Sequence, residues 1–143
     1  MTDKITIAVS KGRIYDETVP LLAKLGIVLK DDPKKSRKLI LDTNQSNIKV
    51  TIIRATDVPT YVEHGAAELG IAGKDVLMEY SGDSLYEPLN LGIAKCRMML
   101  AGLKDAKPII DRPRVVTKYI NITRNYFADR GQQLASHVDR EAP

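Results

Sequence analysis

Strand and helix patterns alternate along most of this chain, and this alternation limits its fold more than any other feature. Ile5, Ile7 and Val9 alternate with polar or small residues, which is typical of a strand, and a helical period follows over residues 15–25. Such alternation favours an α/β fold with a mainly parallel sheet, whose ligands lie at the carboxyl ends of the strands. Further strands are predicted over residues 38–42, 48–53, 69–72, 93–103 and 115–117, and further helices over residues 55–63, 74–80 and 120–133.

Length and composition are typical of a soluble globular protein. The chain has 143 residues, 43% of them hydrophobic and 28% charged, which suffices for one domain or two small lobes. No stretch resembles a signal peptide or reaches membrane-spanning length, so we expect a cytoplasmic protein. The single cysteine, Cys96, lies in an apolar run and is expected to be a buried thiol. The net charge of +4 permits an acidic ligand without requiring nucleic acid.

Lys11-Gly12-Arg13 stands where the first predicted strand passes into the first predicted helix. Backbone N–H groups at the start of a helix attract anions, and Gly12 lets the backbone approach a ligand closely. Lys11 would add a point charge and Arg13 a two-pronged donor. A solvated turn is the alternative, and the local pattern leaves both open.

Other cations lie in loops or follow strands. Arg37 belongs to the basic run of residues 34–38, which is either a solvated loop or a nucleic-acid patch, although it lacks interleaved aromatic residues. Arg54 and Asp57 follow the third strand, where a buried ion pair and a substrate-binding role are both open. Asp57 is also a plausible cap for the helix that follows. Lys118 follows a short strand and either meets an anion or is exposed.

Several common sites are excluded. Residues 70–75, with Gly73, Lys74 and Asp75, do not form a P-loop, because Glu68 and Asp75 occupy positions that need a glycine and a hydroxyl residue. The spacing of histidines and the single cysteine gives no zinc motif, and no Ser/His/Asp arrangement is visible. Catalysis would therefore rest on cations and backbone dipoles, which suit a reaction that builds negative charge on a leaving phosphate.

Four stretches carry a resemblance to a known family. They are AVSKGRIYDETVPLLAKLGI (8–27), DDPKKSRKLI (31–40), IIRATDVPTYVEHGAAELGIAGKDVL (52–77) and VTKYINITRNYF (116–127). Their order and specificity resemble those of the short form of ATP phosphoribosyltransferase, over about residues 5 to 133. This family catalyses the first step of histidine biosynthesis, in which N1 of the ATP adenine joins C1 of phosphoribosyl pyrophosphate and pyrophosphate leaves.

The resemblance implies a two-lobed fold like that of type II periplasmic binding proteins, with the active site in the cleft. It implies a first, ATP-side lobe over residues 1–93 and a second lobe over residues 94–143. It also implies Mg²⁺ brought by the ribose donor, a homodimer within a hetero-oligomer, and a regulatory subunit that resembles histidyl-tRNA synthetase. Neither nucleic acid nor a membrane is an expected partner.

By match to the family's motifs, Arg13 and Arg37 are the expected catalytic residues, which hold ATP and steady the departing pyrophosphate. The other residues implied for substrate binding are Ser10, Lys11, Gly12, Arg54, Asp57, Gly73, Lys74, Asp75, Lys118 and Tyr119. No protein metal ligand is expected.

The last ten residues depart from the family. Family members continue with a second-lobe loop of Asp-Thr-Gly type that cradles the 5-phosphate of the donor, whereas this chain ends in LASHVDREAP. We therefore expect a truncated member with an incomplete second lobe and weak or no activity alone. A non-catalytic cytoplasmic anion- or nucleotide-binding lobe of periplasmic type is the alternative function.

Overall fold

The computed structural model describes residues 4–33, 35–36, 38–105, 112–134 and 136–138. It divides the chain into two units, Met1–Lys95 and Cys96–Pro143. No helix in the described part of the chain is long and apolar enough to cross a membrane.

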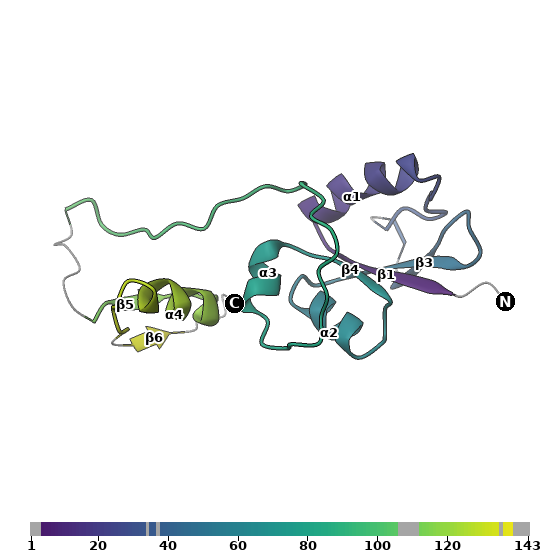
Figure 1. The fold of residues 1–143 in the computed structure, drawn as a ribbon. Coiled ribbons are helices and arrows are strands. Elements are labelled where there is room, and N and C mark those ends of the chain that lie inside the picture. Colours follow the sequence, from purple (N-terminus) through teal and green to yellow (C-terminus); the bar gives the residue numbers. More distant parts are fainter. Residues whose placement is uncertain (1–3, 34, 37, 106–111, 135, 139–143) are drawn as a thin grey trace. The chain divides into compact units, whose positions relative to one another are not determined.

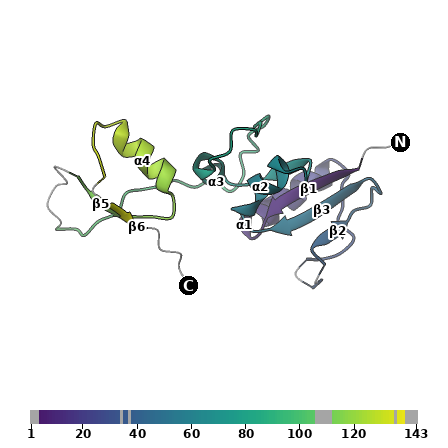
Figure 2. The ribbon, with the colours of Figure 1, turned by 90° about the horizontal axis from the view of Figure 1, so that it is seen from below.

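A four-stranded sheet forms the centre of the first unit (Figures 1 and 2). Its strands, in chain order, are β1 (Ile5–Ser10), β2 (Ile40–Asp42), β3 (Ile48–Ile53) and β4 (Leu69–Ile71), and they lie in the order β2-β3-β1-β4. β1 pairs in parallel with both β3 and β4, while β2 joins the edge of β3 in antiparallel fashion. The α/β class and the mainly parallel sheet are thus confirmed for this unit.

Two helices cover opposite faces of this sheet (Figure 1). α1 (Arg13–Lys24) and α2 (Asp57–Glu63) each follow a parallel strand, and the shorter α3 (Lys74–Glu79) follows β4. Successive side chains of a strand point to opposite faces. Accordingly, Ile7 and Val9 pack with Leu22 of α1, whereas Ala8 packs with Val58 of α2. The apolar and small residues of β1 therefore pack into two hydrophobic cores, one on each face of the sheet.

The carboxyl ends of the three parallel strands meet at one edge of the sheet. Ser10, the last residue of β1, is in register with Ile53 at the end of β3. Val9 is in register with Ile71 at the end of β4. The loops that follow these strands are consequently neighbours, and all three lead into helices.

The second unit contains β5 (Arg114–Val116), α4 (Ile120–Ala128) and β6 (Ser136–Val138), with β5 and β6 paired in parallel. The helix predicted to reach Gln133 ends at Ala128 instead. Gly131 has φ of +68°, and its N–H and that of Gln132 bond to the carbonyls of Ala128 and Phe127. This glycine closes the helix in the manner of a C-terminal cap, a signal that the prediction overlooked. β6 was not predicted either, because the residues after 133 show no alternation of apolar and polar residues.

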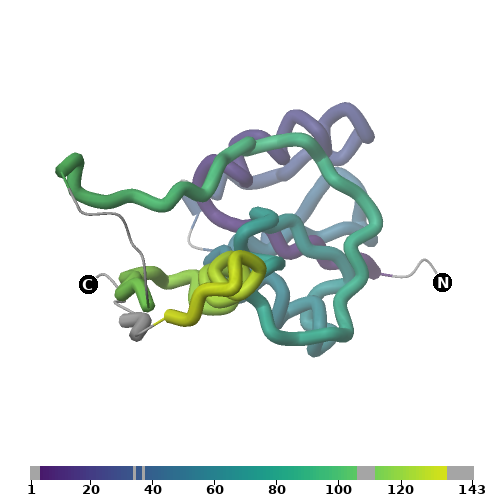
Figure 3. Tube along the Cα trace, turned by 60° about the vertical axis from the view of Figure 1, so that its left-hand side comes forward, coloured from purple at the N-terminus to yellow at the C-terminus, as the bar shows by residue number. Residues whose placement is uncertain are grey.

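The strand predicted over residues 93–103 is wrong. Residues 81–105 contain neither helix nor strand, and the tube in Figure 3 runs through them without a helical turn. An apolar run forms a strand only where a neighbouring strand accepts its backbone hydrogen bonds. No described strand pairs with this run. Ile93 and Ala94 are half-buried, whereas residues 95–103 are exposed. Cys96 is among the exposed residues, which corrects the prediction of a buried thiol.

Candidate functional site

Most of the predicted site residues lie where three strands pass into helices, at the carboxyl edge of the first unit's sheet. One segment follows β1, one follows β3 and one follows β4. In sequence order they supply Ser10, Lys11, Gly12 and Arg13, then Arg54 and Asp57, then Gly73, Lys74 and Asp75. Ligands of open α/β sheets bind at such an edge.

The loop after β1 turns on Gly12. This residue has φ of 83° and ψ of −140°, a conformation that residues with a Cβ atom rarely adopt. The N–H of Lys11 bonds to the carbonyl of Ile53 at 3.0 Å, which ties the turn to β3. No heavy atom lies within 4 Å of where a Cβ of Gly12 would be, so its backbone faces open space.

The start of α1 has the features of an anion site. No side chain caps the helix at Gly12, so the first-turn N–H groups lack the usual side-chain acceptor. Lys11 and Arg13 are both exposed beside it. Asp16 in the first turn opposes an anion, because it already complements the positive end of the helix dipole.

Arg13 has a carboxylate partner within the same helix. Its Nε donates to Oε1 of Glu17 at 2.7 Å, and Oε2 of Glu17 accepts a bond of 2.6 Å from the backbone N–H of Ala94. These two bonds hold the pKa of Glu17 below its ordinary value, the Ala94 bond having the larger effect. Sequence reasoning missed Glu17, although its position four residues after Arg13 on a predicted helix was a usable signal.

Arg54 and Asp57 do not form the buried ion pair that was one of the two alternatives. Arg54 is exposed, and no ion pair joins the two side chains, both of which the structure describes. Asp57 is the first residue of α2 rather than its cap: Thr56 occupies the cap position, and its hydroxyl lies 3.4 Å from Oδ1 of Asp57. The substrate-binding role of both residues stays a prediction.

The loop after β4 lies beside the start of α1. A Cβ on Gly73 would lie 2.3 Å from Oδ1 of Asp75 and 3.7 Å from Cδ1 of Ile14, so a larger residue at this position would require the Asp75 side chain to move. Lys74 is exposed, but its Nζ lies 2.5 Å from Oε2 of Glu87. Lys74, which is predicted to take part in substrate binding, therefore already has a carboxylate partner.

The remaining predicted residues lie elsewhere. Lys118 and Tyr119 belong to the second unit, where the Nζ of Lys118 lies 4.9 Å from the centre of the Tyr119 ring. Tyr119 precedes α4, and its N–H bonds to the hydroxyl of Thr117 at 2.9 Å. Arg37, the second predicted catalytic residue, lies outside the described residues.

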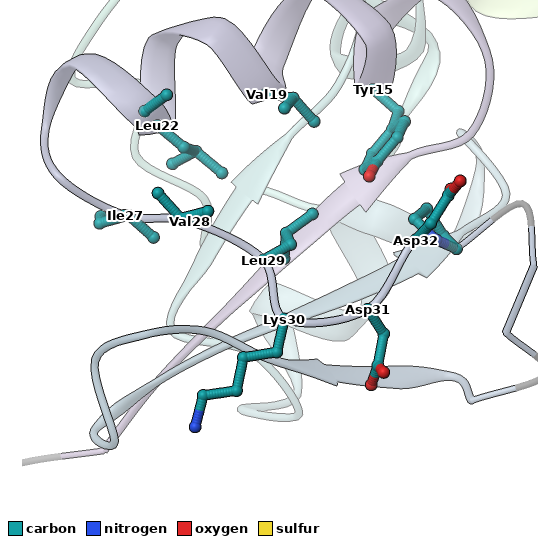
Figure 4. Close-up of a pocket in the computed structure, with 11 residues that line it drawn as sticks. Tyr15, Val19, Leu22, Ile27, Val28, Leu29, Lys30, Asp31 and Asp32 are labelled. Atoms are coloured by element: carbon teal, nitrogen blue, oxygen red, sulfur yellow. The ribbon is translucent and has the colours of Figure 1, made fainter.

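A groove of about 280 Å³ lies between α1 and the loop of residues 27–33 (Figure 4). Tyr15 and Leu22 of α1 project toward this loop, and Asp31 and Asp32 lie at one end. Burial, together with the nearby charge of Asp32, raises the pKa of Tyr15 above its usual range. None of the predicted site residues lines this groove, so it is separate from the candidate site.

The described residues do not provide a protein cage for a metal ion. Among them, no group of three or more His, Cys, Asp or Glu side chains is placed to hold one. Mg²⁺ commonly binds through substrate phosphates, waters and at most one or two carboxylates, and such binding needs no cage of this kind.

The chain is similar over most of its length to known ATP phosphoribosyltransferases. It is 60% identical over 133 residues to the enzyme of Marinobacter nauticus, covering 93% of this chain and 62% of that protein. It is also 60% identical over 130 residues to the enzyme of Pseudomonas syringae pv. syringae, covering 91% of this chain and 62% of that protein. The chain thus spans 62% of the length of these curated relatives.

A solved structure and a family model agree with these relatives. The structure described as the ATP phosphoribosyl transferase (HisG:HisZ) complex from Thermotoga maritima matches with a TM-score of 0.74 and 29% identity. The match covers 96% of this chain and 65% of that one. The family model described as HisG, ATP phosphoribosyltransferase, matches residues 54–139. The chain belongs to the ATP phosphoribosyltransferase family.

Proposed function

We propose that this chain supplies the ATP-binding part of an ATP phosphoribosyltransferase, the enzyme of the first step of histidine biosynthesis. In the proposed reaction, N1 of the ATP adenine forms a bond to C1 of phosphoribosyl pyrophosphate with inversion. The bond between C1 and the pyrophosphate oxygen breaks, and its electron pair leaves with pyrophosphate. The observation that carries this proposal is the uncapped start of α1, flanked by Lys11 and Arg13, in a chain of this family.

The proposed roles follow from where negative charge resides and where it grows. The backbone at Gly12 and the side chain of Lys11 bind ATP phosphate, because a helix start and an ammonium both attract anions. Arg13 and Arg37 hold ATP and steady the departing pyrophosphate, whose charge increases in the transition state. The other residues proposed to line the two sides of the cleft are Ser10, Arg54, Asp57, Gly73, Lys74, Asp75, Lys118 and Tyr119.

The fold of the whole protein and its assembly are also proposed from the family. We infer a type II periplasmic-binding-like arrangement of two lobes, with the first over residues 1–93, in a cytoplasmic enzyme. The relative from Thermotoga maritima is described as a HisG:HisZ complex, which supports a hetero-oligomer with a regulatory subunit resembling histidyl-tRNA synthetase. Mg²⁺ is proposed to arrive bound to the ribose donor.

Calorimetric titration with ATP in the presence of Mg²⁺ tests the proposed binding site. Arg13→Ala is expected to weaken ATP binding about tenfold or more, the usual effect of losing a hydrogen bond to a charged group. Lys24→Ala, which removes a cation from the opposite end of the same helix, is the matched control and leaves binding unchanged. Equal binding by wild type and Arg13→Ala would contradict the proposed role of Arg13.

A pyrophosphate-release assay tests the proposed activity. With ATP, phosphoribosyl pyrophosphate and the regulatory partner present, we expect this chain to show weak turnover or none. Full turnover would contradict this expectation. Binding of ATP without binding of the donor would favour the non-catalytic nucleotide-binding lobe.

A further inference from the structure

Glu17 joins the start of α1, in the candidate ATP site, to the chain segment that leaves the first unit. One of its carboxylate oxygens accepts from Nε of Arg13 at 2.7 Å, and the other accepts from the N–H of Ala94 at 2.6 Å. Glu17 and Ala94 are 77 residues apart in sequence. The first unit ends at Lys95, one residue after this contact.

The segment that Glu17 holds has an unusual backbone. Ala94 has φ of 47°, in the left-handed region that a residue with a Cβ atom rarely occupies, and Gly92 has φ of 66°. The N–H of Gly92 bonds to Oδ1 of Asn90 at 2.9 Å, so this turn is held at both ends by side-chain acceptors. A conformation of this kind persists where its surroundings determine it, and the carboxylate of Glu17 is one such determinant.

Stabilisation of α1 does not account for the Arg13–Glu17 pair. An arginine in the first turn of a helix opposes the helix dipole. A cation that precedes its acidic partner by four residues is also the less favourable order of such a pair. Both groups are partly exposed, at 67% and 36%, where an ion pair adds little to stability. The pair instead fixes the direction of the Arg13 guanidinium. Its Nε donates to a carboxylate that also accepts a hydrogen bond from the N–H of Ala94.

We propose that Glu17 is a positioning residue that couples the Arg13 guanidinium to the backbone of Ala94 and so directs Arg13 toward the ligand at the start of α1. The Nε edge of Arg13 is occupied, and its two Nη groups have no partner among the residues that the structure describes. The Arg13 side chain is 67% exposed, so these donors are accessible to an anion, while the carboxylate that fixes the guanidinium does not itself bind the ligand. The inference rests on the proposed function for the identity of that anion, the phosphates of ATP.

The first arm of the test needs no nucleotide. Exchange of the Ala94 amide proton with solvent is followed by NMR in the full chain, in wild type, Glu17→Gln and Glu17→Ala. Loss of a hydrogen bond to a charged group is expected to speed this exchange about tenfold or more in Glu17→Ala. The amide of Thr123, which bonds to the carbonyl of Tyr119, is the internal control and stays unchanged. Unchanged Ala94 exchange in both variants overturns the inference.

The second arm measures ATP affinity, with Mg²⁺ present, in wild type, Glu17→Gln, Arg13→Ala and the double variant. Glu17→Gln removes a negative charge beside the site, so electrostatics alone predicts tighter binding of ATP. Positioning predicts the opposite: a Kd about threefold higher or more in the wild-type background and no change in the Arg13→Ala background. A Kd that falls or stays constant in Glu17→Gln overturns the inference. If the wild-type chain binds no ATP, the proposed function fails. The exchange rate of the Ala94 amide then tests by itself whether Glu17 holds the backbone of Ala94.

Discussion

The Nζ of Lys74 and Oε2 of Glu87 lie 2.5 Å apart, and both side chains remain substantially exposed, at 64% and 43%. Lys74 opens α3 at the sheet edge that carries the candidate site. Glu87, by contrast, belongs to the stretch of residues 81–105 that has no regular secondary structure. An acidic residue from an irregular segment thus pairs with Lys74, one of the residues predicted to bind substrate.

Glu87→Gln is expected to strengthen ATP binding by a factor of about two to three at low salt. The substitution removes the carboxylate that competes with phosphate for Lys74, and exposed ion pairs of this kind are worth on the order of 0.2–1 kcal/mol. The gain is expected to vanish at high salt, because exposed charges are then screened. Calorimetric titrations at two ionic strengths measure both effects.

Asp42→Asn is the matched control for Glu87→Gln. It removes the carboxylate partner of Lys49, at 3.6 Å, on the same unit but away from the carboxyl edge of the sheet. Its ATP affinity should equal that of wild type. An equal gain in both variants would show that net charge, rather than release of Lys74, causes the effect.

The sequence predicted the first unit well because its core residues follow a simple period. Ile7 and Val9 lie on one face of β1 and Ala8 on the other. Successive residues of the strand therefore pack into the two hydrophobic cores in turn. The position of Lys11-Gly12-Arg13 between β1 and α1 was predicted for the same reason. Parallel pairing then brings the ends of β1, β3 and β4 to one edge, which joins three separate sequence segments.

Contacts between distant segments were not predictable from local pattern. The bond from the Ala94 N–H to Glu17 depends on the path of an irregular segment that has no period. The ion pair between Lys74 and Glu87 has the same origin. The apolar run of residues 93–103 was predicted to be a strand, but no described strand pairs with it. Strand propensity does not by itself supply a neighbouring strand for backbone hydrogen bonds.

Gly12→Ala is expected to destabilise the first unit by about 1–3 kcal/mol, the cost of a non-glycine residue in a backbone region that is nearly reserved for glycine. Space is not the obstacle, since nothing lies within 4 Å of the new methyl group. Urea unfolding followed by circular dichroism measures the change. Gly102→Ala is the control: its surroundings are equally open and its φ is not positive, so its stability should match wild type.

Glu63 is expected to make the first unit sensitive to acid. The Ser84 hydroxyl donates to its Oε1 at 2.5 Å and the Tyr80 hydroxyl donates to its Oε2, and these bonds hold the pKa of Glu63 below the ordinary value of 4.5. A lowered pKa in the folded state means that the ionised carboxylate stabilises the fold above pH 4.5 and that this contribution is lost as the pH falls through the folded value.

Glu63→Gln tests whether the Glu63 carboxylate loses its stabilising effect as the pH falls. The difference in urea midpoint between wild type and variant should be largest near neutral pH and should shrink below pH 4.5, where the wild-type carboxyl takes up a proton. Ser84→Ala removes the donor with the largest effect and should move the loss of stability to higher pH. A midpoint difference that stays constant across the acid range would rule out this assignment.

The exposed apolar run of residues 98–103 is expected to make the chain associate. Met99 is 76% exposed and Leu103 is 85% exposed, and neighbouring apolar side chains extend the patch beyond what an isolated surface residue presents. Replacing both residues by lysine should lower the mass measured by light scattering and weaken its dependence on concentration. Leu25→Lys is the matched control, because Leu25 is 72% exposed at the end of α1, outside this run, and its replacement should leave the mass unchanged. A wild-type chain that is a stable monomer at every concentration would contradict the expectation, because a patch of this kind lowers the free energy of association only if it is buried between copies.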